Sequence, residues 1–204
     1  MIWTFSEPDN ARAAGMAVFS EDPPGWTRPP KPRYRYRLGR KLSTSPRVLE
    51  APWYALPAEV KRVVFVMLNP STADAFELDP TVTRCCKFAA RWGGEVLEVV
   101  NLFAFRSPDP SVLRAQHPAE RGADVLNTSI ILDRCIGAHR VVAAWGSGGT
   151  LENRAQAVTE MLMVRGVPLL ALARVPSDGS PMHPLARGKH RIPDDCEPQP
   201  WGPT

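Results

Sequence analysis

Residues 63–68 read VVFVML, and a polar turn, NPST, follows them at residues 69–72. A short, continuous apolar run that is rich in β-branched residues is typical of a strand buried on both faces. Further runs of this kind occur at residues 96–105, 140–145 and 167–172. Four such runs predict a buried sheet of four strands.

Helical periodicity lies between these strands. In one segment, Val82, Cys85, Cys86 and Ala89 recur at the i, i+3, i+4 and i+7 spacing of a helix face. The pattern predicts helices at residues 81–92, 127–135 and 151–164. Because strands alternate with helices, we expect an α/β fold with a parallel sheet.

The chain has 204 residues, which is the length of one domain. Prolines crowd both ends, so we expect an irregular lead-in at residues 1–30, a single domain at 31–192 and an irregular tail at 193–204. No apolar run reaches the length of a membrane span, and the acidic start MIWTFSEPDNAR does not resemble a signal peptide. We therefore expect a cytoplasmic protein without a membrane partner, and a monomer.

The 25 basic residues comprise 20 Arg and 5 Lys, and the net charge is +4. Eight of them, with no acidic residue, lie between residues 23 and 49. Inside this run, RYRYRL places Arg33, Arg35 and Arg37 on one face of a predicted strand. The strand is either a charged edge strand with a solvated face or a ridge that contacts phosphates. An Arg-rich genome would also explain the excess of Arg over Lys.

Polar residues follow each predicted strand, at the edge where α/β sheets bind ligands. They are Asn69, Pro70, Ser71, Asn101, Phe103, Arg106, Ser147 and, in the last loop, His183. Three of these segments also have a structural interpretation: Asn69 starts a turn, Asn101 is a hydrogen-bonded core amide, and the glycines around Ser147 form an ordinary turn. His183 lies between two prolines in a rigid loop, which favours a functional role.

Other chemistries have little support. Cys85 and Cys86 are adjacent, Cys135 and Cys196 are distant, and no C-x-x-C pair occurs, so we expect no metal and no cofactor. The G-x-S-x-G motif of a serine hydrolase is absent.

The chain resembles an uncharacterised bacterial and phage family, the domain of unknown function 1643, over residues 34–190. The blocks that carry the resemblance are MLNPSTADAFELDPTVTRCCKFAARWGG, EVVNLFAFRSPDP, AWGSGG and DGSPMHPL. More distantly, the order of these blocks is similar to the uracil-DNA glycosylase superfamily. That resemblance implies a three-layer sandwich around a central four-stranded parallel sheet.

The superfamily resemblance also implies roles for individual residues. Asn69 and Pro70 match the motif that handles the attacking water, with Asp74 or Asp79 close enough to assist. Asn101 matches the base-reading amide, and His183 matches the residue that stabilises the leaving base. Pro70 and the adjacent Ser71 are also expected to contact the base, and Phe76 or Phe103 is expected to wall the base pocket. Met67 and Leu185 depart from the superfamily pattern, which leaves substrates other than plain uracil open.

These expectations lead to a DNA glycosylase that flips out and excises a damaged or modified base, by inference a pyrimidine, in repair or phage defence. The residues expected to contact single- or double-stranded DNA are Arg33, Arg35, Arg37, Arg106, Ser147, Arg187, Lys189 and Arg191. Two alternatives remain: a nucleic-acid binder without catalysis, and an enzyme that acts on free nucleosides or nucleotides.

Overall fold

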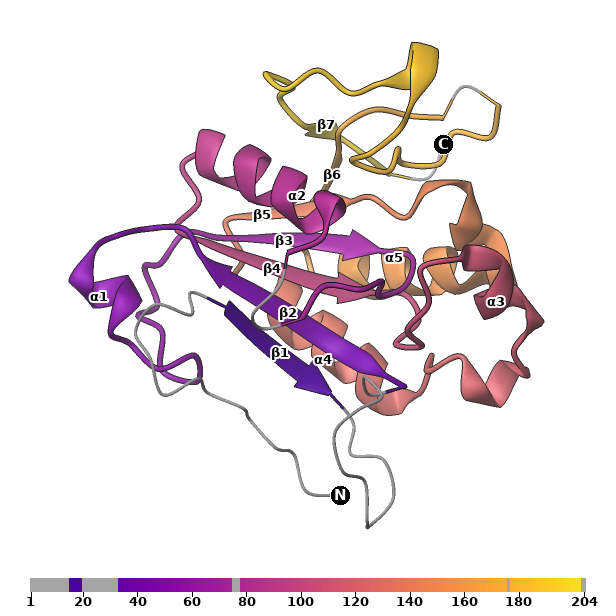
Figure 1. The fold of residues 1–204 in the computed structure, drawn as a ribbon, viewed down its shortest axis with the longest axis horizontal. Helices are drawn as coiled ribbons and strands as arrows, with labels where there is room; N and C mark the ends of the chain where they lie inside the picture. The colour runs from indigo at the N-terminus through magenta and orange to yellow at the C-terminus, as the bar shows by residue number, and fades with distance from the viewer. Residues whose placement is uncertain (1–14, 20–32, 75–77, 176, 203–204) are drawn as a thin grey trace.

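The fold is described by a computed structural model that covers residues 15–19, 33–74, 78–175 and 177–202 (Figure 1). One seven-stranded sheet runs through the molecule in the order β1-β2-β4-β3-β5-β6-β7. Its strands are β1 (Gly15–Phe19), β2 (Arg35–Lys41), β3 (Arg62–Met67), β4 (Val96–Asn101), β5 (Arg140–Ala143), β6 (Leu169–Ala171) and β7 (Gln199–Pro200). β3 pairs in parallel with β4 and β5, and β5 with β6, whereas β1, β2 and β7 add antiparallel pairs at the two sides.

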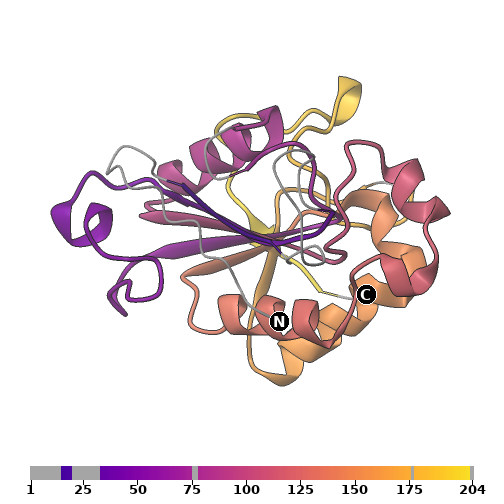
Figure 2. The ribbon, with the colours of Figure 1, turned by 60° about the horizontal axis from the view of Figure 1, so that its bottom comes forward.

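Helices cover both faces of this sheet (Figure 2). The helices are α1 (Pro46–Leu49), α2 (Pro80–Arg91), α3 (Pro110–Ala115), α4 (Val125–Cys135) and α5 (Arg154–Val164), with short 3-10 helices η1 (Pro118–Glu120), η2 (Gly146–Asn153) and η3 (Gly188–His190). On one face, Phe65 and Val99 pack with Phe88 of α2. On the other face, Val64 and Val66 pack with residues of α4 and α5. The α/β class is confirmed, although the sheet has seven strands where four were expected.

Most predicted elements lie where the apolar pattern places them. The predicted helix at 81–92 is α2, whose N-terminus is capped by Asp79 through a 2.8 Å bond from the Val82 N–H. The predicted helix at 151–164 begins later, at Arg154, because Glu152 and Asn153, the last two residues of η2, both adopt left-handed backbone angles. Such angles interrupt a helix, so periodicity alone places this boundary too early.

The termini are more ordered than expected. β1 lies within the lead-in that we predicted to be irregular, and β7 lies within the predicted irregular tail. Trp201, just after β7, packs against Trp145 with ring centroids 5.1 Å apart. The two ends therefore extend the sheet on its opposite sides.

The arginine-rich strand is not an edge strand. β2 is paired on both sides, and its register with β1 shifts between Arg37 and Arg35, which breaks the strict alternation that we predicted. Arg35 is 2% exposed and donates to the Ala73 carbonyl, while Arg37 is 9% exposed and pairs with the buried Glu98. Neither guanidinium lies on a solvated ridge, so the expectation that Arg35 and Arg37 contact phosphates is wrong. β1 pairs with one side of β2, and the residue 72–74 loop contacts Arg35 and Arg40. The alternating pattern of β2 by itself does not predict that these two segments cover it.

Candidate functional site

Three of the predicted segments meet on the α2 face, at the carboxyl ends of the parallel strands. Asn101 ends β4 and lies in register with Met67, the last residue of β3. Met67 packs in one core cluster with Ala73 and with Met182, the residue before His183. The sheet therefore brings Asn101 and the His183 loop to one edge, as the parallel pattern predicts.

Asn101 is the most informative residue of this site. Its side chain is 1% exposed, and its Nδ2 makes no hydrogen bond to the described residues. Most buried polar groups in proteins are paired, and an unpaired buried donor destabilises the fold. The interpretation of Asn101 as a fully bonded core amide is therefore wrong, and the free donor is suited to a ligand.

The backbone at Asn101 is held in place by residues that the sequence reasoning missed. Asn127 of α4 is fully buried, and its Nδ2 donates to the carbonyls of Asn101 and Leu102 at 3.1 and 3.0 Å. Arg154, at the start of α5, donates from Nε to the Leu102 carbonyl at 3.0 Å. No motif marks these residues, because their role depends on contacts far apart in the chain.

His183 is half-buried in the loop that packs against the end of β5. Its Nδ1 accepts a 3.1 Å hydrogen bond from the Leu185 N–H, which assigns the ring proton to Nε2. Burial lowers the pKa of His183, although the charge of Asp79 opposes this shift. At neutral pH the side chain is therefore a neutral imidazole with Nε2–H as its donor.

Three arginines donate to backbone carbonyls of the residue 72–74 loop, which precedes α2. Arg35 and Arg106 donate toward the Ala73 carbonyl, the latter at 3.5 Å, and Arg40 donates to the carbonyl of Asp74. Burial lowers the pKa of Arg35, and the nearby Arg106 lowers it further, whereas Asp79 raises it. The guanidinium groups remain protonated at neutral pH, so these arginines hold the 72–74 loop in a positively charged environment.

Asn69 has a clear structural role. Its Nδ2 donates to the Ser107 carbonyl at 2.9 Å and more weakly to the Phe105 carbonyl at 3.4 Å. The Pro70 carbonyl accepts from the Ser107 N–H at 2.9 Å, and Ser71 follows at half-buried depth. Asn69 and Pro70 therefore tie the loop after β3 to the loop after β4, which leaves the Asn69 Oδ1 for other contacts.

The expected aromatic wall is not formed by Phe103. This ring is fully buried in the cluster on the α4 and α5 face, opposite the α2 face. Core packing leaves no surface for a ligand, so the expectation for Phe103 is wrong. Phe76 lies outside the described residues.

The remaining basic residues divide into paired and exposed ones. Arg33 forms a 2.8 Å ion pair with Glu120 and lies over the ring of Tyr34. Arg187, Lys189 and Arg191 are exposed around η3, shortly after His183. Ser147 is exposed beside the same loop. The pKa of Asp178 is lowered mainly by the hydrogen bond from the Ser180 N–H, and the hydrogen bond from the Ser147 side chain lowers it further.

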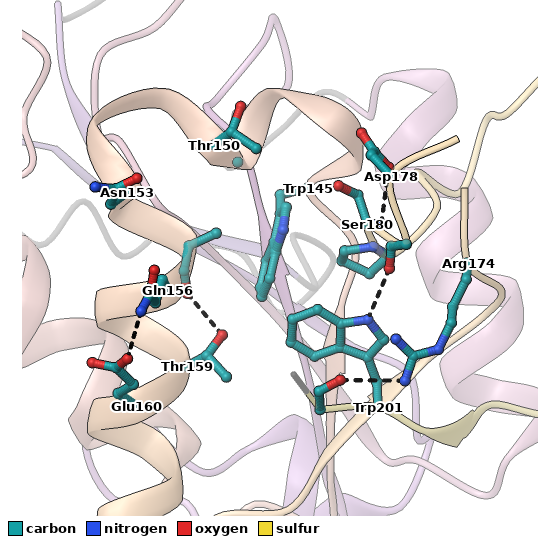
Figure 3. Close-up of a pocket in the computed structure, with 15 residues that line it drawn as sticks. Trp145, Thr150, Asn153, Gln156, Thr159, Glu160, Arg174, Asp178, Ser180 and Trp201 are labelled. Carbon is teal, nitrogen blue, oxygen red and sulfur yellow. Dashed lines mark hydrogen bonds between the residues drawn. The ribbon is translucent and has the colours of Figure 1, made fainter. Parts of the chain in front are cut away.

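A cavity of about 310 Å³ lies beyond the ends of β5 and β6, between α5 and the C-terminal segment (Figure 3). Trp145 and Trp201 form part of its wall, and Gln156 and Glu160 of α5 lie on another side. Sequence reasoning missed this cavity because Trp201 belongs to the tail that we predicted to be irregular.

The described residues contain no group of three or more His, Cys, Asp or Glu side chains that could hold a metal ion. None of the helices within 33–74, 78–175 and 177–202 is long and apolar enough to cross a membrane.

A family model described as "Protein of unknown function (DUF1643)" matches residues 35–185. The chain belongs to this family. Its match spans β2 to the His183 loop, and thus every element of the α2-face site. No curated protein and no solved structure matches the chain.

Proposed function

We propose that this DUF1643 protein is a DNA glycosylase that hydrolyses the N-glycosidic bond of a damaged or modified base, flipped out of the strand. The single observation that carries the proposal is the buried Asn101 amide, whose Nδ2 makes no hydrogen bond to the described residues. A flipped base presents carbonyl and ring-nitrogen acceptors on its Watson–Crick edge. Such an acceptor would take the hydrogen bond that Asn101 Nδ2 can donate, and Asn101 Oδ1 would accept a hydrogen bond from an N–H group of the same base.

The placement of the motif segments also supports this proposal. The segments that resemble the uracil-DNA glycosylase superfamily follow β3, β4, β5 and β6, which lie side by side in the parallel part of the sheet. A superfamily-like arrangement would use this edge as the base pocket. In that pocket Asn101 reads the base, and the sugar lies toward the loop after β3.

His183 is suited to the leaving group. When the glycosidic bond breaks, negative charge develops on the base, and a preorganised neutral donor stabilises that charge. The His183 Nδ1 is already occupied by the Leu185 N–H, so Nε2–H is the group available to donate. Its lowered pKa keeps this donor neutral at physiological pH.

The attacking water is assigned to Asn69 Oδ1, with the Asp74 carboxylate as the group that assists. Asp79 accepts the Val82 N–H as the cap of α2 and acts here through its charge. A growing positive charge on the sugar favours carboxylates nearby. Since an amide is a weak base, we expect slow turnover.

DNA would be held by the exposed basic residues after His183. Arg187, Lys189 and Arg191 lie around η3, and none of the three forms an ion pair with a described acidic residue. Contacts from these residues to phosphates release counterions, which makes binding depend on salt.

The test is a panel of oligonucleotides that carry deaminated, oxidised or hypermodified pyrimidines, followed by alkali cleavage at abasic sites. We expect cleavage with at least one modified base and loss of cleavage in Asn101→Leu and His183→Ala. His139→Ala is the matched control, because His139 lies just before β5, at the opposite edge of the sheet from His183. No abasic product from any oligonucleotide would refute the glycosylase.

A second candidate, a nucleic-acid binder without catalysis, is favoured by one observation. The Asn69 amide nitrogen is bonded to the loop after β4, and the Asp79 carboxylate caps α2, so both groups also have structural roles. Salt-dependent binding of the same oligonucleotides without abasic product would support this candidate. Processing of free nucleosides without oligonucleotide binding would instead support a nucleoside enzyme.

A further inference from the structure

We propose that the cavity beside α5 binds a planar heteroaromatic ring that carries amino groups. We call this cavity the tryptophan pocket; its principal lining residues are Trp145, Gln156, Glu160, Arg174, Asp178 and Trp201. Its volume of about 310 Å³ lies at the small end of the range for small-molecule sites. A single heterocycle such as a nucleobase matches that size.

Two tryptophans form an aromatic corner in this pocket. The rings of Trp145 and Trp201 meet at 87°, with centroids 5.1 Å apart (Figure 3). Trp201 is fixed by its backbone N–H, which donates to the Leu169 carbonyl at 2.8 Å, and by its indole N–H, which reaches the Gly179 carbonyl at 3.5 Å. Trp145 is 4% exposed, so it supports the corner from behind, and the half-buried Trp201 ring is the surface on which a planar ligand stacks. That surface is already ordered before binding.

The opposite side of the pocket is rich in hydrogen-bond acceptors. Gln156 Nε2 donates to Glu160 Oε1 at 2.8 Å, which leaves the Gln156 carbonyl oxygen and the second Glu160 oxygen to accept from a ligand. Both side chains lie on α5 across from the tryptophans (Figure 3). Amino groups on a ring are the complementary donors.

The charges of the lining also select the ligand. Glu160 and Asp178 are acidic, whereas Arg174 is the basic member of the lining, so the net charge is −1. Arg174 is already used: it donates to the Gly202 carbonyl at 3.3 Å and lies 5.9 Å from the Trp201 ring centre. A phosphate would therefore meet net repulsion, and a neutral or protonated amino-substituted base is favoured over its phosphorylated form.

This pocket is separate from the α2-face site. Trp145 packs in the core cluster with Val158 of α5, whereas Met67, the register partner of Asn101, packs in the cluster with α2. The two sites thus lie on different faces of the sheet, although Ser180 and Pro181, which line the pocket, belong to the same loop as His183. Binding in the tryptophan pocket does not depend on the glycosylase proposal.

Isothermal titration calorimetry of the full chain with adenine, cytosine, uracil and adenosine monophosphate tests the proposal. We expect adenine or cytosine to bind with a dissociation constant of about 1 mM or lower, and uracil and the monophosphate to bind at least about fivefold more weakly. Glu160→Gln should weaken the binding of the amino-bearing base about tenfold, as the loss of a charge-assisted hydrogen bond predicts. Trp201→Phe should weaken it less, because a smaller ring retains part of the stacking surface.

Two control variants separate this site from other effects. Glu197→Gln removes an exposed carboxylate that faces Arg140 outside the pocket and should leave binding unchanged. Asn101→Leu should also leave it unchanged, even if oligonucleotide cleavage is lost. The proposal is overturned if neither amino-bearing base binds up to about 10 mM, if uracil or the monophosphate binds as tightly, or if Glu160→Gln has no effect.

Discussion

Two buried asparagines, one on each face of the β4 end, should respond in opposite ways to the same substitution. Asn101 and Asn127 are 1% and 0% exposed. Asn101 Nδ2 makes no hydrogen bond to the described residues, whereas Asn127 Nδ2 donates to the Asn101 and Leu102 carbonyls and only the Asn127 Oδ1 lacks a partner there. Leucine has a similar size and branching to asparagine but no polar atoms. Replacing each asparagine by leucine therefore distinguishes an amide that binds a ligand from an amide that stabilises the fold.

The magnitudes follow from these contacts. An unsatisfied buried donor costs about 1–3 kcal/mol, so Asn101→Leu should raise the free energy of unfolding by about 1–2 kcal/mol. At about 2–4 °C per kcal/mol for a chain of this size, Tm should rise by roughly 2–8 °C. Asn127→Leu removes two hydrogen bonds and takes this donor from the buried Asn101 carbonyl, and the removal of the unpartnered Asn127 Oδ1 offsets part of the loss. We expect it to lose about 2–4 kcal/mol, a fall in Tm of roughly 4–16 °C.

Thermal denaturation followed by circular dichroism at 222 nm measures both changes, and the abasic-site assay on the same samples measures activity. The expected pattern is a stabilised but inactive Asn101→Leu protein and a destabilised Asn127→Leu protein. Stability gained by removing a functional group is common at active sites. If Asn101→Leu loses as much stability as Asn127→Leu, the Asn101 amide serves the fold, and the argument for base reading fails.

Three further predictions concern charge. Arg37→Ala should cost about 3–5 kcal/mol, because it leaves the Glu98 carboxylate buried without its partner; a loss below 1 kcal/mol in urea titration would show that Glu98 is compensated elsewhere. Because the pKa of His183 is lowered in the folded state, the unfolded state takes up a proton first as pH falls below about 6.5. Stability should therefore fall from that pH downward, and His183→Gln should flatten this part of the Tm–pH curve; an unchanged curve would contradict the assignment. Lys189→Gln should reduce the slope of log binding constant against log salt by about 0.9 if Lys189 contacts a DNA phosphate, as measured by fluorescence anisotropy with Lys87→Gln of α2 as the control; equal slopes for both variants would remove Lys189 from the interface.

The local pattern of the sequence was sufficient for the parallel strands and for α2. Apolar, β-branched runs can be satisfied only by burial on both faces, so β3 could be located from residues 63–68 alone. The position of Asn101 at the edge that ligands use follows from the same reasoning, because the carboxyl ends of parallel strands coincide. Whether its amide is paired or free could not be predicted, because that depends on neighbours from distant segments.

The arginines of β2 show the other limit. The charge alternation at residues 33–38 is the same for a solvated face and for a buried one. The difference arises from distant partners: the Ala73 carbonyl for Arg35 and the Glu98 carboxylate for Arg37. Pairing with β1, and the register shift within it, could not be predicted, because β1 is a single apolar run of five residues, GMAVF, in an otherwise irregular lead-in.

The sequence by itself determined the α/β class, the strands that meet at one edge, and the polar residues that end them, because these depend on local periodicity. Only the tertiary structure decided which arginines are buried, which amide lacks a partner, and that Trp201 closes a cavity against Trp145. Those outcomes depend on which groups meet across long stretches of chain, since a polar side chain is stable in the interior only where a partner reaches it.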